Sequence, residues 1–170
     1  YEGHVMGVLN VTPDSFYDGG KYKDLNSIVS QAKQMLEDGA TFIDIGGAST
    51  KPGADVVDEK EEINRVIPVI NAIKQHAPKA IISIDTTSSV VAEKAVTSGA
   101  SIVNDISAGT FDDRMLAVVA SLGIPYIAMH IQGTPKTMQI NPTYEHVVDD
   151  VFRAIESFCN RAIKQGIKQI

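Results

Sequence analysis

Short apolar segments rich in valine and isoleucine recur along the chain and are separated by longer stretches of mixed apolar and polar residues. The apolar segments are residues 5–9, 42–45, 80–84, 101–103 and 126–129. Their apolar residues follow one another without alternation, which is typical of strands that are covered on both faces. The pattern therefore predicts five buried β-strands.

The stretches between these segments have the spacing of amphipathic helices. Apolar residues share one helical face in residues 28–36 and 63–70, and further helices are expected around residues 88–97, 114–121 and 144–164. Pro68 lies inside the second of these stretches, where we expect it to kink or break the helix.

Glycine marks the end of most predicted helices. Gly39, Gly99, Gly123 and Gly166 each follow a helical pattern and precede an apolar one. Glycine ends helices readily because it adopts the left-handed conformation without a steric penalty. The repeated order of strand, loop, helix and glycine predicts a parallel sheet with helices outside it.

The expected fold class is α/β, specifically a TIM (β/α)8 barrel of which about the first five βα units are present. Such a barrel typically takes about 250 residues. The 170 residues would then form the N-terminal part of one barrel domain, with residues 167–170 at the start of a sixth strand. An open five-stranded doubly wound sheet is the alternative.

Composition narrows the range of partners. The net charge of −6 argues against a surface that neutralises nucleic-acid phosphates. No apolar run is long enough to cross a bilayer, and we expect no signal peptide. The single cysteine, Cys159, cannot form an internal disulfide, which is consistent with a reducing compartment. We expect a cytoplasmic protein that binds small molecules, without nucleic-acid or membrane partners.

Polar side chains stand at or near the carboxyl end of every predicted strand. These residues are Asn10, Asp44, Asp85, Asn104 and His130. Parallel α/β proteins build their sites at this edge because the loops there converge. One such residue alone is readily explained as a turn former or helix cap, and His130 could simply orient its loop. Five such ends together favour a binding site.

Two long polar loops follow the first two strands. The first, residues 10–20, carries Phe16, and the second, residues 48–53, carries Lys51 and Pro52. Hydroxyls, backbone amides and a lysine suit phosphate oxygens, and loops of this length often close over a site. The alternative is an ordinary surface crossover.

The segments at residues 6–16 and 44–53 resemble the signatures of the dihydropteroate synthase family, and shorter blocks at residues 83–86, 104–106 and 129–135 follow in that family's order. This resemblance implies the condensation of hydroxymethyl-dihydropterin pyrophosphate with p-aminobenzoate. The products are dihydropteroate, a folate precursor, and pyrophosphate. Pyrophosphate is expected to leave first, with Mg²⁺ assisting, and the arylamine then attacks the pterin cation.

The resemblance also implies roles for individual residues. It assigns the pterin to Asp85, Asn104, Ile106, Met129 and Asp44, pyrophosphate and p-aminobenzoate to Thr50, Lys51, Ser49, Pro52 and Phe16, and Mg²⁺ to Asn10. Asp44 would also orient the mouth of the site, and the alternative for Ile106 is a core role. It makes Asn10, Asp85 and Asn104 the catalytic residues. A carboxylate accepts the adjacent N–H donors of a pterin, and an amide NH₂ can meet a neighbouring acceptor.

One departure from the family concerns Lys51, which stands where most relatives have arginine. The ammonium group of lysine is a single point charge, whereas the guanidinium of arginine binds an oxyanion through two hydrogen bonds at once. The family's later strands supply further site residues, so we expect residues 1–170 alone to be inactive and the whole protein to form a homodimer. Two alternatives stay open, which are a pterin-binding methyl-tetrahydrofolate methyltransferase and a non-catalytic half-barrel that pairs with a second chain.

Overall fold

The computed structural model describes residues 3–11, 21–48, 57–134 and 136–170 and contains a parallel five-stranded sheet. The strands are β1 (Met6–Asn10), β2 (Phe42–Gly46), β3 (Ile81–Asp85), β4 (Ile102–Asp105) and β5 (Tyr126–Ala128). All neighbouring strands are parallel, as the continuous apolar segments predict. The five predicted strands are confirmed.

A helix follows each strand, so the described residues form five βα units. The helices are α1 (Lys21–Glu37), α2 (Glu59–His76), α3 (Ser89–Thr97), α4 (Met115–Leu122) and α5 (Val147–Gln165). The four glycines predicted to end helices all have positive φ, between 67° and 117°. Their left-handed conformation turns the chain back toward the sheet.

Helix α2 runs without interruption through Pro68, so the expected break is wrong, and the expected kink stays a prediction. Proline removes the hydrogen bond to the carbonyl four residues earlier, which belongs to Asn64. Both Pro68 and Asn64 are exposed to solvent. Water can therefore donate a hydrogen bond to the carbonyl oxygen of Asn64. The opposite face of the helix stays packed against the sheet.

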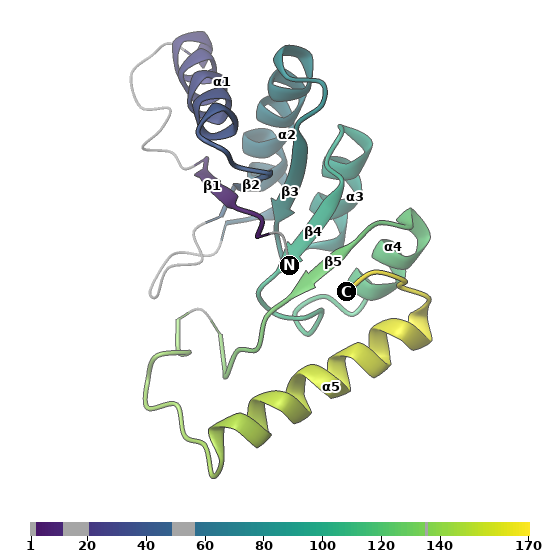
Figure 1. Ribbon diagram of the computed structural model, residues 1–170. Helices are drawn as coiled ribbons and strands as arrows, with labels where there is room; N and C mark the ends of the chain where they lie inside the picture. The colour runs from purple at the N-terminus through teal and green to yellow at the C-terminus, as the bar shows by residue number, and fades with distance from the viewer. Residues whose placement is uncertain (1–2, 12–20, 49–56, 135) are drawn as a thin grey trace.

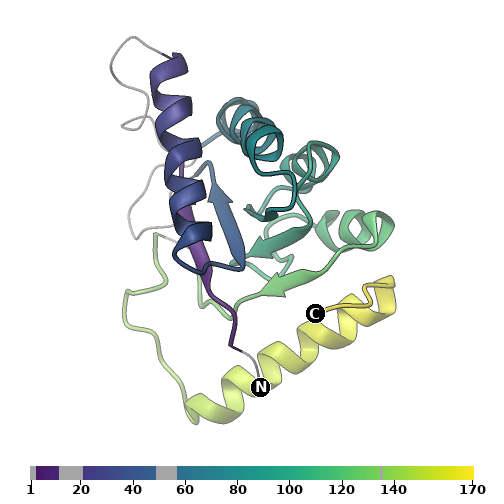
Figure 2. The same ribbon diagram turned by 45° about the horizontal axis from the view of Figure 1, so that its top comes forward.

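The strand order distinguishes the two predicted folds. The strands lie side by side in the order β1-β2-β3-β4-β5, and helices α1 to α4 form a layer on one side of the sheet (Figures 1 and 2). A doubly wound sheet reverses its strand order and carries helices on both faces. The doubly wound alternative is therefore wrong, and the arrangement is that of successive units of a (β/α) barrel.

The core lies between the sheet and this helical layer. Strand residues that point toward the helices are almost fully buried, and they include Ile43, Ile45, Ile82, Ile84 and Val103. The opposite face of the sheet is more open, since Val8 is 56% exposed there. Successive strand residues alternate between the two faces, so this open face carries a separate set of side chains.

The register of strand pairing arranges the side chains of this open face in rows. Asn10 pairs with Gly46, Gly46 with Asp85, and Asp85 with Asn104, so these four residues form one row at the carboxyl ends. We call it the upper row. Two residues earlier on each strand, Val8, Asp44, Ser83 and Ile102 form the lower row. The predicted polar strand ends are thus distributed over two levels of one face.

The last residues of the sequence lie beside β5. The backbone N–H of Tyr126 donates a 3.0 Å hydrogen bond to the carbonyl oxygen of Gln169. Residues 167–170 therefore occupy the place where a sixth parallel strand would pair. Within the described ranges, none of the helices is both long and apolar enough to cross a membrane.

Candidate active site

The upper row contains a gap between two side-chain oxygens. A Cβ placed on Gly46 would lie 3.5 Å from Asn10 Oδ1 and 3.3 Å from Asp85 Oδ2. Because Gly46 has no side chain, the space between the amide and the carboxylate stays free at the carboxyl ends of β1, β2 and β3. The structure thus brings together two of the three residues predicted to be catalytic.

Asn104, the third of these residues, reaches across β3 to the lower row. Its Nδ2 donates a 3.0 Å hydrogen bond to Asp44 Oδ2, although the two residues are 60 positions apart in the sequence. Asp44 is only 4% exposed, and its other oxygen, Oδ1, is buried without a hydrogen-bond partner among the described residues. The carboxylate oxygen is the acceptor of this bond, so the NH₂ group of Asn104 faces Asp44.

Asp85 sits in a strongly acidic and partly buried environment. Burial, followed by the negative charges of Asp44, Glu62 and Asp105, raises its pKa from 3.8 to about 7. A carboxyl group with such a pKa changes its charge near neutral pH. N–H donors from a ligand would favour the ionised form, because hydrogen bonds to the charged form lower a pKa.

The loop after β4 is organised around a buried carboxylate. Asp105 is fully buried and accepts hydrogen bonds from the backbone N–H groups of Ser107 (2.7 Å) and Gly109 (2.9 Å) and from the hydroxyl of Tyr126 (2.5 Å). The loop includes Ile106, which is half-buried. Asp105 therefore fixes the backbone that follows one predicted pterin contact, Ile106.

The predicted pterin contact Met129 lies just beyond β5. Its backbone N–H donates to the carbonyl oxygen of Asp105 at 3.4 Å, and its side chain is 44% exposed. Met129 is therefore joined to the end of β4 and is accessible. Next to it, His130 Nε2 and the hydroxyl of Tyr144 form a 3.3 Å hydrogen bond, which supports the loop-orienting role considered for His130.

The chain leaves β2 through a tightly packed glycine. A Cβ on Gly47 would lie 2.7 Å from Val66 Cγ1 and 3.0 Å from Glu62 Cγ, so α2 can approach only a glycine. Arg65 Nη1 donates a 2.8 Å hydrogen bond to the carbonyl oxygen of Gly47. Glu62 is buried, and this burial raises the pKa of its carboxyl group.

This turn precedes the second of the two predicted phosphate-binding loops. Of the residues predicted for pyrophosphate and p-aminobenzoate, Phe16, Ser49, Thr50, Lys51 and Pro52 lie outside the described residues. Their roles stay predictions. Arg65 and Gly47 set the point from which the second loop departs.

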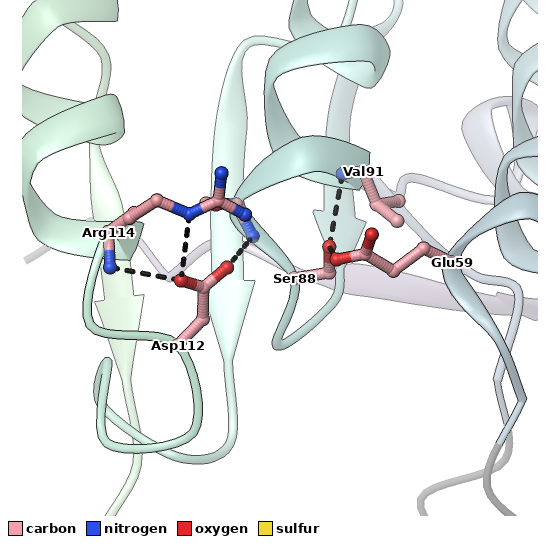
Figure 3. A network of polar contacts seen from close by, with 6 residues as sticks. Glu59, Ser88, Val91, Asp112 and Arg114 are labelled. Atoms are coloured by element: carbon pink, nitrogen blue, oxygen red, sulfur yellow. Dashed lines mark hydrogen bonds and ion pairs between the residues drawn. The ribbon is translucent and has the colours of Figure 1, made fainter.

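Polar contacts also fix the loop that follows Asp85. Ser88 caps α3 by accepting from Val91 N (3.3 Å) and donates a 2.7 Å hydrogen bond to Glu59 Oε1, as Figure 3 shows. Asp112 accepts from the N–H of Arg114 at 2.9 Å (Figure 3). It also accepts from Ser89 N at 2.8 Å. These bonds tie the first turns of α2, α3 and α4 together at the rim.

A cleft of about 480 Å³ lies beside this network, outside the two rows. Its lining comes from the first turns of α2 and α3 and from the loop before α4: Val57, Glu59, Glu62, Thr87, Ser88, Phe111, Asp112, Asp113 and Arg114. Glu59, Ser88, Asp112 and Arg114 are already engaged with one another or with backbone groups. Much of the polar lining of this cleft is therefore occupied by contacts within the protein.

The side chains at the strand ends can hold a metal ion only if a bound ligand supplies part of the ion's coordination shell. Among the described residues there is no group of three or more His, Cys, Asp or Glu side chains that could hold a metal. Asn10 presents one exposed amide oxygen at the free space beside Gly46. Mg²⁺ commonly takes one or two protein oxygens and completes its shell with water and substrate phosphates. Asn10 fits that pattern.

These features define a (β/α)-barrel protein with a polar ligand site at the carboxyl ends of its strands. Residues 6–170 match the family described as "Pterin binding enzyme", and the chain belongs to this family.

Its relatives carry consistent names. A dihydropteroate synthase of Haemophilus influenzae is 44% identical over 165 residues, with 97% of this chain and 59% of that protein covered. One of Synechocystis is 49% identical over 164 residues, with 96% and 56% covered. The dihydropteroate synthase of Yersinia pestis, solved with a sulfonamide drug, superposes with a TM-score of 0.88 at 42% identity, with 97% and 59% covered. The chain thus spans less than two thirds of each relative.

Sequence reasoning assigned no role to three residues that shape the site, which are Asp105, Tyr126 and Arg65. Asp105 is noticeable only as the neighbour of Asn104, and its role depends on Tyr126, 21 residues away. Arg65 lies in an ordinary helical pattern, and no local signal links it to Gly47, which is 18 residues earlier. These contacts join separate elements, so neither spacing nor periodicity indicates them.

Proposed function

We propose that the complete protein is a dihydropteroate synthase. It would condense hydroxymethyl-dihydropterin pyrophosphate with p-aminobenzoate to give dihydropteroate and pyrophosphate in folate synthesis. The observation that carries this proposal is the upper row, in which Asn10, Asp85 and Asn104 face one open side of the sheet around Gly46. Relatives named dihydropteroate synthase at 44% and 49% identity support it.

In this proposal the flat pterin lies over the carboxyl ends of β3, β4 and β5. Asp85 accepts N–H donors from the amino-pyrimidine edge, and the Asn104 carboxamide contacts a neighbouring edge. Ile106 and Met129 give apolar contact to the ring. A buried carboxylate selects strongly for a ligand with matching donors, because a ligand without them leaves the carboxylate unsatisfied.

Asn10 would hold Mg²⁺ together with the substrate's pyrophosphate. When bound, the ion neutralises negative charge on the departing pyrophosphate. The residues of this chain bind and orient the two substrates, and Thr50 and Lys51 are expected to hold phosphate oxygens. Ser49, Pro52 and Phe16 are expected to frame p-aminobenzoate.

We also propose that the complete protein is cytoplasmic and forms a homodimer. The half-buried free Cys159, with no second cysteine in the sequence, suits a reducing compartment. Sedimentation of the complete protein measures its oligomeric state directly.

Steady-state assay of dihydropteroate formation by the complete protein tests the function. We expect activity that depends on both substrates and falls at least about 100-fold in Asp85→Ala and in Asn104→Ala. Calorimetric titration with pyrophosphate and Mg²⁺ separates the proposal from a methyltransferase, which has no use for a pyrophosphate site. Full activity in both variants would contradict the assigned site.

A further inference from the structure

We propose that Asp44 is a positioning residue that holds the carboxamide of Asn104 in one of its two flip states. This inference rests on the proposed function, because the ligand that Asn104 meets is taken to be a pterin. Asp44 itself would make no contact with the ligand. This indirect role takes the place of the direct pterin contact that the family resemblance implies for Asp44.

The contact between the two side chains carries the inference. Asn104 Nδ2 lies 3.0 Å from Asp44 Oδ2. One N–H of the amide is thereby committed to the carboxylate, and the carbonyl oxygen of the amide must lie on the side away from it. Asn104 then offers a donor and an acceptor to the ring in one fixed order. A flipped amide would present that order reversed and would match a different arrangement of ring nitrogens.

Burial explains why Asp44 acts indirectly. Asp44 belongs to the lower row, two residues before Gly46, and is only 4% exposed. Its oxygen Oδ1 is buried and has no hydrogen-bond partner in the part of the chain that the structure describes, and its oxygen Oδ2 faces Asn104. Asp44 therefore offers no accessible acceptor to a ligand that lies over the strand ends. Asn104, in the upper row, is only partly buried and can meet such a ligand.

A small residue on the intervening strand makes this contact possible. Strands β2 and β4 lie on either side of β3, so their side chains must bridge about 10 Å, which is two strand spacings. The β3 residue paired with Asp44 is Ser83, which is fully buried. A branched side chain at this position would fill the space in which the aspartate and the asparagine meet.

A double-mutant cycle on the complete protein tests the proposal. The dissociation constant for hydroxymethyl-dihydropterin pyrophosphate is measured for the unsubstituted protein, Asp44→Asn, Asn104→Ala and the double variant. We expect Asp44→Asn to weaken binding about tenfold, because an asparagine can donate as well as accept and no longer selects one flip state. The double variant should bind no more weakly than Asn104→Ala, because Asp44 acts only through Asn104.

Ser83→Val provides a second route that leaves both functional groups in place. It should weaken pterin binding as Asp44→Asn does, whereas Ser83→Ala, which keeps a small side chain, should not. The KM for p-aminobenzoate should stay unchanged in Asp44→Asn and in Ser83→Val, which distinguishes loss of orientation from general damage to the fold.

The outcomes separate the two proposals. The role of Asp44 is overturned if the fold losses in pterin affinity of the two single variants multiply in the double variant. It is also overturned if folded Ser83→Val binds the pterin normally. Either result leaves the proposed function intact. Absence of any pterin binding by the unsubstituted protein overturns the proposed function itself.

Discussion

The hydroxyl group of Tyr126, at the start of β5, donates a 2.5 Å hydrogen bond to Oδ2 of the buried Asp105 at the end of β4. The ring of Tyr126 stacks on Phe158 of α5 at 5.5 Å. Burial, followed by the charge of Asp105 and this hydrogen bond, raises the pKa of Tyr126. The hydroxyl therefore stays protonated and joins β5 to β4, while the ring joins β5 to α5.

Replacement of Tyr126 by phenylalanine should destabilise the protein by about 1–3 kcal/mol, because it leaves the buried Asp105 carboxylate with one donor fewer. Urea unfolding measures this loss. Tyr144→Phe is the matched control, since it removes a hydroxyl from a partly exposed 3.3 Å contact with His130 and should cost less than about 1 kcal/mol. Equal stability of Tyr126→Phe and the unsubstituted protein would contradict the importance of this bond.

Gly47→Ala should destabilise the protein by about 1–3 kcal/mol, because the added methyl group would overlap Val66 and Glu62 of α2. Thermal and urea unfolding report the change. Gly3→Ala is the control, since none of the described residues has an atom within 4 Å of a Cβ at that position. In combination with Val66→Ala, which removes the closest atom, the loss should be smaller than the sum of the two single losses.

Arg65→Ala should cost about 1–2 kcal/mol through the lost hydrogen bond to the carbonyl oxygen of Gly47. Arg65 also pairs with Glu61 at 3.0 Å, but Glu61 is 51% exposed, so this ion pair should contribute little. We therefore expect Glu61→Gln to change stability by less than about 0.5 kcal/mol. A large effect of Glu61→Gln that disappears in high salt would assign the energy to the ion pair instead.

Asp85→Asn should stabilise the protein at alkaline pH while it removes pterin binding. The folded-state pKa of Asp85 is raised to about 7, so ionisation of this group opposes folding increasingly as the pH rises from about 4 to about 7. The difference from the ordinary value of 3.8 corresponds to at most about 4 kcal/mol.

Urea unfolding at several pH values measures this effect. The stability gained by Asp85→Asn should grow over that pH range and then level off. Asp113→Asn, which alters an exposed carboxyl group, should change stability by no more than about 0.5 kcal/mol. A gain for Asp85→Asn that is independent of pH would show that ionisation of Asp85 is not its source.

Asn10→Ala should weaken the effect of Mg²⁺ on pyrophosphate binding by about tenfold or more, because Asn10 is the proposed protein ligand of the ion. Calorimetric titration of the complete protein with pyrophosphate, with and without Mg²⁺, measures this effect. Asn26→Ala, at an exposed position on α1, is the control. An unchanged Mg²⁺ effect in Asn10→Ala would remove the ion from this site.

Most of the fold could be predicted from the sequence because its signals are local. Each strand is a continuous apolar segment, and each helix has its own apolar face. Glycines such as Gly123 and Gly166 end helices through their own φ angles of 67° and 99°. The same locality explains why the sequence wrongly suggests a break at Pro68, because whether α2 continues through this residue depends on which side of the helix faces solvent.

The candidate site could be predicted only as a set of residue types. The sequence places Asn10, Asp85 and Asn104 at strand ends, and the register confirms that they share one row. It could not indicate that Asp44 lies one level lower, because that depends on where each strand ends relative to its neighbours.

The sequence by itself determined the alternation of strands and helices and the polar character of the strand ends, since each depends on residues close together in the chain. Only the tertiary structure decided which of those polar groups meet. The bonds from Asn104 to Asp44 and from Tyr126 to Asp105 connect different strands. They exist because parallel pairing fixes the height of each side chain and because the small Ser83 leaves room for the first of them.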